Sequence, residues 1–198
     1  MSPGFPPRIV LATQNEHKIR EILRICADWP VEWVTDAELP HVEETGRTYL
    51  DNSRLKARAA AAATGEAALA DDSGIEIDAL GGGPGPRSAR YAGEGATDLA
   101  NLEALLGALA GIPRGGRTGR YRAVAVLASP DGGELVAEAT CEGLIGTKPR
   151  GSGGFGYDPI FEPLGWDRTM AELEPEEKDR ISHRGRALRR LRDLLAGG

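Results

Sequence analysis

Short apolar segments alternate with helical patterns along the first part of this 198-residue chain. The run 8–12 (RIVLA) is rich in branched residues and predicts a buried strand. From Glu16 to Trp29 apolar residues recur at helical spacing, and Pro30 ends the pattern. Apolar segments at 31–34 and 67–70 predict two further strands. Strands that alternate with helices are typical of an α/β fold.

Three more helices are expected from their end signals. Thr48 begins a capping-box pattern, and Gly65 is a natural C-terminal stop for the long Ala-rich segment between them. Thr97 and Ser182 are expected to cap two later helices, the first of which stops at Gly111. The first should present one apolar stripe, formed by Leu99, Leu102, Leu105, Leu106 and Leu109, and the second carries Leu188, Leu191, Leu194 and Leu195.

The later strands are predicted from alternation and turn chemistry. Residues 75–80 alternate with period two, as a half-exposed strand does, and the glycine- and proline-dense stretch 81–86 is expected to be a loop. Strands at 121–129 and 134–145 flank a Pro-Asp-Gly-Gly turn and so predict a hairpin. Crossover and hairpin connections together imply an α/β fold with a mixed sheet. With no long linker, residues 1–198 are expected to form one domain or two small lobes.

Charge limits the partners of this chain. The net charge of −6 argues against a surface built as a whole to hold a polyanion, so any phosphate site must be local. Of the 24 basic residues only Lys18, Lys56, Lys148 and Lys178 are lysine, and the others are arginine. Lysine carries a compact point charge where arginine presents a planar fork, so these lysines indicate where to look for special sites. Three of the four fall in the motifs below.

Cysteines and hydropathy bear on the compartment. Cys26 and Cys141 lack the spacing of a disulfide framework or a zinc site and are expected to be small buried residues. The N-terminal residues have no basic segment, and no apolar stretch approaches the roughly 20 residues of a membrane span. A cytoplasmic protein without membrane contact is therefore expected.

One candidate anion site lies between the first strand and the first helix. Residues 13–18 (TQNEHK) place a polar turn at a helix N-terminus, where free N–H groups and the positive end of the dipole favour an anion. Asn15 and Lys18 would add a neutral donor and a cation. The alternative is that Asn15 or Thr13 merely caps the helix and Lys18 is solvated.

Two acidic segments form a candidate metal site. Glu43-Glu44-Thr45-Gly46 precedes the second helix, and Asp71-Asp72-Ser73-Gly74 is expected to form a turn after the strand at 67–70. Clustered carboxylates suit Mg²⁺, which generally takes one or two of them together with water and substrate phosphate. The alternative is that each segment is a solvated turn.

Two more segments carry mixed chemistry. In 151–159 (GSGGFGYDP), glycines allow a ligand to approach the backbone, Phe155 or Tyr157 would stack on a base, and Asp158 would accept from a ring N–H. Alternatively the segment is a tight turn whose aromatic side chains fill the core. Residues 178–186 (KDRISHRGR) place cations at an expected helix start, where the dipole disfavours them unless an anion or carbonyl is near. The alternative there is a solvated basic face.

Together these segments resemble the inosine/xanthosine triphosphate pyrophosphatase family. The resemblance rests on six motifs in sequence order: Thr13-x-Asn15-x-x-Lys18, Glu43-Glu44-Thr45-Gly46, Ala70-Asp71-Asp72-Ser73-Gly74, Ser88-Ala89-Arg90-Tyr91, Gly153-Gly154-Phe155-Gly156-Tyr157-Asp158-Pro159 and Ile181-Ser182-His183-Arg184-Gly185. Gln14 departs from the glycine expected there, which bears only on the fine fit of the phosphate turn.

The resemblance implies Mg²⁺-dependent hydrolysis of non-standard purine nucleotides. ITP, dITP, XTP and dXTP would be cleaved between the α and β phosphates to the monophosphate and pyrophosphate. The implied fold is an elongated α/β protein of the Maf/ITPase kind, with two lobes around a long mixed β-sheet with flanking helices. The active cleft would lie between the lobes, and a homodimer would be the usual assembly.

The same resemblance assigns roles to residues. The triphosphate would be held by Thr13, Gln14, Asn15, Glu16, His17 and Lys18, with Lys56 and Lys178 as further cations. Glu44 and Asp72 would hold the metal, Asp72 would also be the general base, and Ser73 would contact the substrate. Asp71 would either reach the metal through water or only tie down the turn. The base pocket would comprise Phe155, Gly156, Tyr157, Asp158, His183 and Arg184.

Base selectivity would follow from hydrogen-bond donors. Donors from His183 and Arg184 would suit the 6-oxo group of hypoxanthine or xanthine. The 6-amino group of adenine would leave each such donor unpaired at a cost of roughly 1–3 kcal/mol.

Two other functions compete with this interpretation. A Maf-like pyrophosphatase would act on modified pyrimidine triphosphates and would be distinguished by a panel of nucleotides. A non-catalytic nucleic-acid-binding module would use the arginines of the last helix, but the net charge and the lack of an RNP- or KH-like pattern count against it.

Overall fold

The computed structural model describes residues 4–197, so Met1, Ser2 and Pro3 of the N-terminal segment considered above, and Gly198, lie outside the described residues. The chain divides into two compact units. The first unit draws on Met1–Asp72, Ala123–Ala139 and Arg184–Gly198, and the second on Ser73–Arg122 and Thr140–His183.

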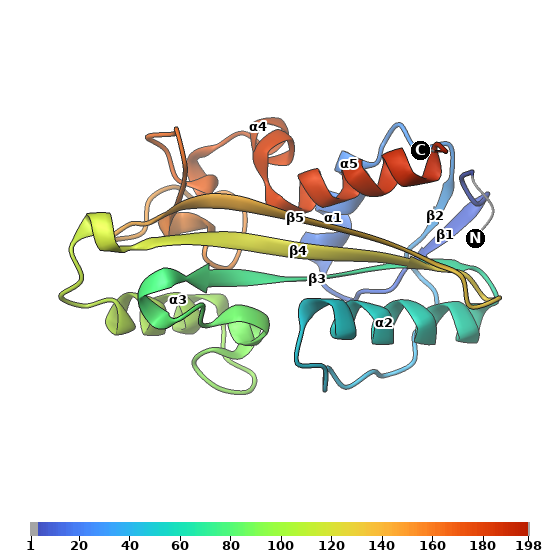
Figure 1. Cartoon of the computed structure of the whole chain (residues 1–198), viewed down its shortest axis with the longest axis horizontal. Helices are drawn as coiled ribbons and strands as arrows, with labels where there is room; N and C mark the ends of the chain where they lie inside the picture. Colours follow the sequence, from blue (N-terminus) through green and yellow to red (C-terminus); the bar gives the residue numbers. More distant parts are fainter. Residues whose placement is uncertain (1–3, 198) are drawn as a thin grey trace. The chain divides into compact units, whose positions relative to one another are not determined.

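A mixed sheet forms the frame of the fold (Figure 1). Within the described chain it has six strands in the order β2-β1-β3-β4-β5-β6. Their bounds are Arg8–Leu11 (β1), Glu32–Val34 (β2), Ala67–Ile77 (β3), Thr118–Ala128 (β4), Glu134–Ile145 (β5) and Phe161–Pro163 (β6). β1 is parallel to β2 and β3, whereas β5 and β6 are antiparallel. The predicted α/β class and mixed sheet are confirmed.

The longer helices are α1 (Glu16–Ile25), α2 (Tyr49–Thr64), α3 (Asp98–Ala108), α4 (Pro175–Ile181) and α5 (His183–Leu195). The ends of α2 follow its sequence signals, because Thr48 accepts the N–H of Asp51 and Gly65 adopts a left-handed conformation with φ 71°. Thr97 likewise caps α3 through the N–H of Ala100. Neither α4 nor β6 was expected from the sequence.

Alternating strand residues sort the core of the first unit into two layers. In β1, Ile9 packs in one apolar cluster with Ile22 of α1 and Leu188 of α5. Val10 faces the other way, in a cluster with Ala57 of α2. The small alanines of α2 let its backbone approach the sheet closely. Within this unit, Figure 1 shows α2 on one side of the strands and α1 and α5 on the other.

The second unit has its own core, in which Leu102, Leu105 and Leu109 of the α3 segment pack with Phe161 and other buried residues. Cys26 and Cys141 are both buried thiols, as expected. No helix among the described residues is long and apolar enough to cross a membrane.

Two helical predictions were wrong in detail. α1 ends at Ile25 instead of Trp29, because the chain turns at Cys26 and Trp29 donates its N–H to the Cys26 carbonyl. Trp29 is still buried, but from a turn and beside the Phe5 ring. Leu99 is 62% exposed, so it does not pack with the other leucines of the apolar stripe expected for α3.

The strands predicted at 67–70 and 75–77 are confirmed, but the predictions for residues 71–74 and 78–80 were wrong, and the first of these errors concerns the site. Asp71 and Asp72 do not form a turn, because β3 continues without a break from Ala67 to Ile77. Residues 78–80 then form a short 3₁₀ helix instead of strand. Charged side chains normally interrupt a buried strand, so both aspartates must have partners inside the protein.

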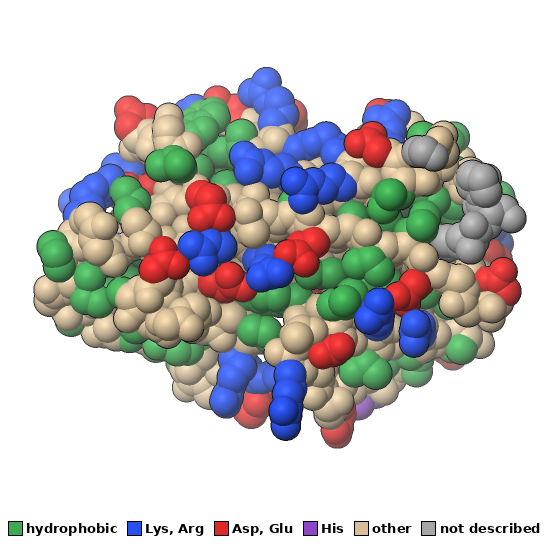
Figure 2. Space-filling view, viewed as in Figure 1, with side chains coloured by type: hydrophobic (Ala, Val, Ile, Leu, Met, Phe, Trp, Pro, Cys, Tyr) green, Lys and Arg blue, Asp and Glu red, His purple; other side chains and the backbone are tan. Residues whose placement is uncertain are grey.

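Charges of both signs mix on the molecular face drawn in Figure 2, where Lys and Arg side chains are interspersed with Asp and Glu. Opposite charges are also paired in the second unit, where Arg120 binds both Asp78 and Glu142 at 3.0 Å. A mixed surface of this kind suits solubility and differs from a continuous basic stripe.

Two glycine substitutions are expected to change stability in opposite directions. Gly65→Ala should lower the free energy of unfolding by about 1 kcal/mol, because alanine resists the left-handed conformation at the end of α2. Gly107→Ala, inside α3, should raise it by about 0.5–1 kcal/mol. An added Cβ meets no heavy atom within 4 Å at either position, so new packing contacts do not contribute to the change in stability of either variant. Urea denaturation measures both, and a shift of the same sign in the two variants would contradict the assignment.

Candidate active site

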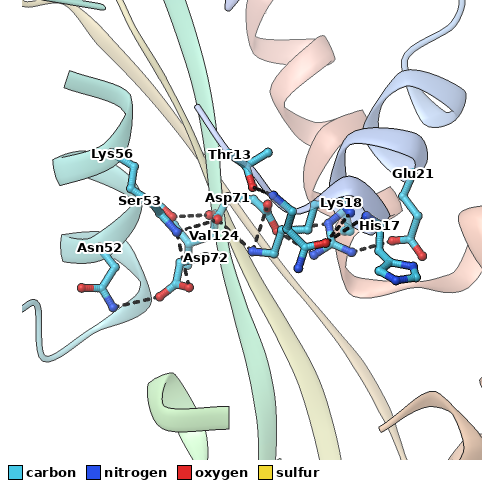
Figure 3. A network of polar contacts seen from close by, with 12 residues as sticks. Thr13, His17, Lys18, Glu21, Asn52, Ser53, Lys56, Asp71, Asp72 and Val124 are labelled. Atoms are coloured by element: carbon cyan, nitrogen blue, oxygen red, sulfur yellow. Dashed lines mark hydrogen bonds and ion pairs between the residues drawn. The ribbon is translucent and has the colours of Figure 1, made fainter. Parts of the chain in front are cut away.

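Asp71 of β3 lies at the centre of a buried ionic network in the first unit (Figure 3). The Arg184 guanidinium donates to Asp71 Oδ2 from two nitrogens, at 2.8 and 3.1 Å. The Lys18 Nζ lies 3.2 Å from Asp71 Oδ1. Burial would raise the pKa of the Asp71 carboxyl, but the nearby Arg184 and Lys18 charges outweigh it and hold this pKa well below its usual range.

Arg184 is itself 2% exposed and binds a second carboxylate, since its NH1 donates to Glu21 Oε2 at 2.5 Å. The fork of this arginine is therefore occupied by two acidic side chains. The structure thus gives Arg184 partners different from the base oxygen expected from the sequence, and its role in base binding stays a prediction.

Asp72, the next residue of β3, has weaker partners in the same unit. Asn52 Nδ2 donates to Asp72 Oδ2 at 3.0 Å, and Lys56 Nζ lies 3.7 Å from Asp72 Oδ1. Burial is the largest influence and raises the pKa of the Asp72 carboxyl, although Lys56 and Lys18 partly offset it. A carboxylate with a raised pKa and incomplete charge compensation is suited to accept a proton.

Lys56 joins the two acidic segments predicted from the sequence. Its Nζ lies 2.7 Å from Glu44 Oε1 and 3.7 Å from Asp72 Oδ1. Burial would lower the pKa of Lys56, but these two carboxylates outweigh it and leave the pKa raised. One ammonium group is therefore shared by the two carboxylates.

Two lysine side chains also converge on one backbone oxygen. Lys18 Nζ and Lys56 Nζ each donate to the Asp71 carbonyl at 3.1 Å. Burial, together with the positive charge of Lys56 among its neighbours, lowers the pKa of Lys18 despite the nearby Asp71 carboxylate. The two ammonium groups therefore meet at one backbone oxygen, while each is also paired with a carboxylate.

The turn before α1 is a helix cap. Asn15 Oδ1 accepts the N–H groups of His17 at 2.9 Å and of Lys18 at 3.2 Å. Thr13 Oγ1 accepts the Asn15 N–H at 3.2 Å. Gln14, Asn15, Glu16 and His17 are exposed. The geometry establishes the cap, and an additional contact of residues 13–17 with phosphate stays a prediction.

The second unit gathers another set of predicted residues around Asp158, which is 3% exposed. Its Oδ2 accepts the Phe155 N–H at 2.9 Å and a hydrogen bond from Lys178 Nζ at 2.5 Å. The same ammonium lies 5.1 Å from the centroid of the half-buried Phe155 ring. Gly154 has φ +67°, and an added Cβ there would overlap the Asp158 carboxylate. The glycine-rich segment is thus wrapped around one buried acid.

Tyr157 and His183 lie deeper in this unit. The Tyr157 hydroxyl donates to the Ser88 carbonyl at 2.8 Å, so this aromatic fills the core. The His183 ring stacks on Tyr121 with centroids 4.5 Å apart. Gly156, the residue before Tyr157, donates its N–H to Asp98 Oδ2 at 2.8 Å. Ser73, the remaining predicted residue, is half-buried in β3.

The expectation that Lys178 lies at a helix start was wrong. Lys178 belongs to the last turn of α4, which begins at Pro175, and α5 begins separately at His183. A cation near a helix C-terminus is favoured by the dipole, so its position needs no bound anion.

Glu44 and Asp72 are the best candidates for a metal. Among the described residues no group of three or more His, Cys, Asp and Glu side chains is placed to hold an ion. Two carboxylates that already share the Lys56 ammonium nevertheless fit a hard cation such as Mg²⁺, which completes its shell with water and phosphate.

Two buried residues of the network were missed in the sequence. Glu21 binds Arg184, and Asn52 binds Asp72. Asn52 carried a signal, since a polar residue one helical turn before Lys56 lies on the same face of the Ala-rich α2. Glu21 carried none, because its partner is 163 residues away in the chain.

The sheet and the buried network define an α/β protein with clustered carboxylates and ammonium groups around one central strand. Residues 9–194 match the Ham1 family, and the chain belongs to that family. A dITP/XTP pyrophosphatase of Desulforamulus reducens is 47% identical over 191 residues, covering 95% of each chain.

Solved structures agree. A HAM1 protein from Coxiella burnetii has a TM-score of 0.87 and 42% identity, covering 96% of this chain and 99% of its own. The Ham1 protein of Staphylococcus aureus has a TM-score of 0.85 and 41% identity, covering 96% of this chain and 98% of its own.

Neutralising the two aspartates should affect stability differently. Asp71→Asn should lower the free energy of unfolding by about 3–5 kcal/mol, because it leaves the buried Arg184 charge without its main partner. Asp72→Asn should leave it unchanged or raise it at neutral pH. The pKa of Asp72 is raised, so the folded state binds its proton more tightly than the unfolded state does, and the ionised carboxylate costs stability. Thermal and urea unfolding at pH 7 test this, and equal losses in both variants would contradict it.

Proposed function

We propose that this chain hydrolyses non-standard purine nucleoside triphosphates, dITP and XTP together with ITP and dXTP, to the monophosphate and pyrophosphate. It would thereby remove them from the nucleotide pool. Relatives named dITP/XTP pyrophosphatase match it over nearly their full length. The observation that carries the proposal is the Lys56 ammonium shared by Glu44 and Asp72 beside the buried β3 network.

In this proposal Glu44 and Asp72 hold Mg²⁺. The bound ion would supply neutralisation of the charge that develops on the pyrophosphate leaving group. The donor set supports this, because two carboxylates leave room for water and phosphate oxygens.

Lys18 and Lys56 bind phosphate oxygens, since their ammonium groups are already gathered at the Asp71 carbonyl. The segment from Thr13 to His17 adds polar contacts at the start of α1. Asp72 accepts a proton from the attacking water as the bond between the α and β phosphates breaks. Its raised pKa supports this role, because a stronger base takes the proton more readily.

The purine is recognised by residues of the second unit. Phe155 stacks on the base, and Asp158 accepts from a ring N–H while Lys178 holds its carboxylate in place. Gly156, Tyr157 and His183 shape the same segment, and Ser73 contacts the substrate. Arg184 acts on the site through Asp71 in the contacts described above, or binds the base as first expected.

The proposal extends to assembly and location. The two units act together as one pyrophosphatase domain, the protein forms a homodimer, and it works on the cytoplasmic pool of nucleotides. The resemblance to the pyrophosphatase family supports these three points.

A panel of nucleotides tests the activity. With Mg²⁺, dITP and XTP should be cleaved about ten- to a hundredfold better than ATP, because each donor that faces the 6-amino group of adenine is left unpaired at a cost of roughly 1–3 kcal/mol. Pyrophosphate should be released, and orthophosphate should not. Ion chromatography of the products measures both. If dTTP or UTP were the better substrates, the chain would be a pyrimidine enzyme, and steep salt-dependent oligonucleotide binding without turnover would favour a nucleic-acid module.

Asp72→Asn should reduce turnover by about a hundredfold or more, because it removes both a metal ligand and the base. Asp28→Asn is the matched control in the same unit, since Asp28 is exposed and pairs with Arg192 at the surface. Steady-state kinetics and circular dichroism compare the two. Retention of more than about a tenth of the activity by Asp72→Asn would rule out the assigned base.

A further inference from the structure

Asn52 is a fully buried amide in the middle of the first unit's acidic site. It lies on α2, one helical turn before Lys56, and its exposure is 0%. Its Nδ2 donates to Asp72 Oδ2 at 3.0 Å. Figure 3 draws this hydrogen bond as a dashed line. This bond engages one carboxylate oxygen of Asp72, whereas the other lies toward Lys56 at 3.7 Å.

The oxygen of the Asn52 amide binds the segment that precedes α2. Asn52 Oδ1 accepts the N–H of Gly46 at 2.9 Å. Gly46 comes two residues after Glu44, whose carboxylate binds Lys56 at 2.7 Å. One side chain therefore ties the segment that carries Glu44 to the carboxylate of Asp72.

Position 46 requires glycine because neighbouring side chains leave no room for a Cβ, and not because of its backbone conformation. Its φ lies outside the left-handed region, yet an added Cβ would lie 2.5 Å from Asn52 Oδ1 and 2.6 Å from Asp51 Cβ. The loop can approach Asn52 this closely only with glycine. Gly46 and Asn52 thus form one interlocked contact.

We infer that Asn52 is a positioning residue that fixes the relative placement of Glu44 and Asp72 for the reaction. The inference rests on the proposed function and deepens it. The Asn52 amide supplies the donor for Asp72 and the acceptor for Gly46 from two separate atoms, whereas alanine supplies neither and an ionised aspartate supplies only an acceptor. A residue that orients metal ligands in this way typically contributes about 10- to 100-fold to metal affinity or activity.

The next residue on α2 offers a matched structural control. Ser53 is also 0% exposed, and its hydroxyl donates to the Val124 carbonyl at 2.8 Å. Ser53→Ala removes a buried hydrogen bond from the same helix without touching either carboxylate. It should lower the melting temperature and leave the kinetics unchanged.

The kinetic test compares Asn52→Ala, Asn52→Asp and Ser53→Ala with dITP and Mg²⁺. Both Asn52 variants should lose about 30- to 100-fold in kcat with less than about a threefold change in KM, since displacement of a reacting group by about 1 Å costs about a hundredfold. The Mg²⁺ concentration for half-maximal rate should rise about tenfold. If Asn52→Ala kept more than half of kcat and the wild-type Mg²⁺ requirement, the inference would be overturned.

Two readouts are independent of turnover. Mn²⁺ titration followed by electron paramagnetic resonance, without nucleotide, should show about tenfold weaker binding in Asn52→Ala and wild-type binding in Ser53→Ala. Hydrogen exchange of the Gly46 amide should accelerate in Asn52→Ala but stay slow in Asn52→Asp, which keeps an acceptor. Wild-type Mn²⁺ binding in Asn52→Ala, or equal Gly46 exchange in all variants, would contradict the inference.

Gly46→Ala approaches the same contact from the other side. Its new Cβ should displace the loop and reproduce the kinetic loss of Asn52→Ala while residue 52 is intact. The wild-type protein separates the two hypotheses: if it does not release pyrophosphate from dITP or XTP, the proposed function fails. The Mn²⁺ and exchange measurements then still decide whether Asn52 holds the two carboxylates together.

Discussion

The buried ion pair between Asp71 and Arg184 is the constraint on which the first unit depends. A carboxylate in the middle of an 11-residue strand is tolerable only with a cation held against it. Arg184 stands at the start of α5 and also binds Glu21 of α1, so one guanidinium links β3 with two helices. Lys18 completes the charge balance on the other oxygen of Asp71. The strand can therefore remain extended through two consecutive acids.

The same arrangement makes the two aspartates unequal. Successive residues of a strand point to opposite faces, so Asp71 and Asp72 are separated by the strand although they are adjacent in sequence. Asp71 is paired with Arg184 and Lys18, whose charges lower its pKa, whereas burial raises the pKa of Asp72. In the proposed function, structural and reactive roles are thus divided between neighbours. The destabilisation expected from ionised Asp72 is of the kind that active sites tolerate when the surrounding fold is well determined.

Local signals in the sequence predicted most of the elements, because their causes are local. Thr48 and Gly65 set the ends of α2 through contacts within a few residues. The continuity of β3 could not be predicted in this way, because it depends on Arg184, 113 residues away in the chain. The same distinction holds for the candidate site. Residue types and spacing were enough to predict that carboxylates and lysines belong to it, but the hydrogen bond between Asn52 and Asp72 could be found only in the folded structure.

The use of lysine and arginine bears on how a chain of net charge −6 would hold a polyphosphate in the proposed function. Three of the four lysines are largely buried and bind carboxylates, namely Lys18, Lys56 and Lys178. The fourth, Lys148, is exposed. Two ammonium groups can meet at the Asp71 carbonyl because each is compact. Two planar guanidinium groups would crowd that oxygen. In the proposed function, the ammonium groups of Lys18 and Lys56, and not the surface charge as a whole, would therefore bind the phosphates.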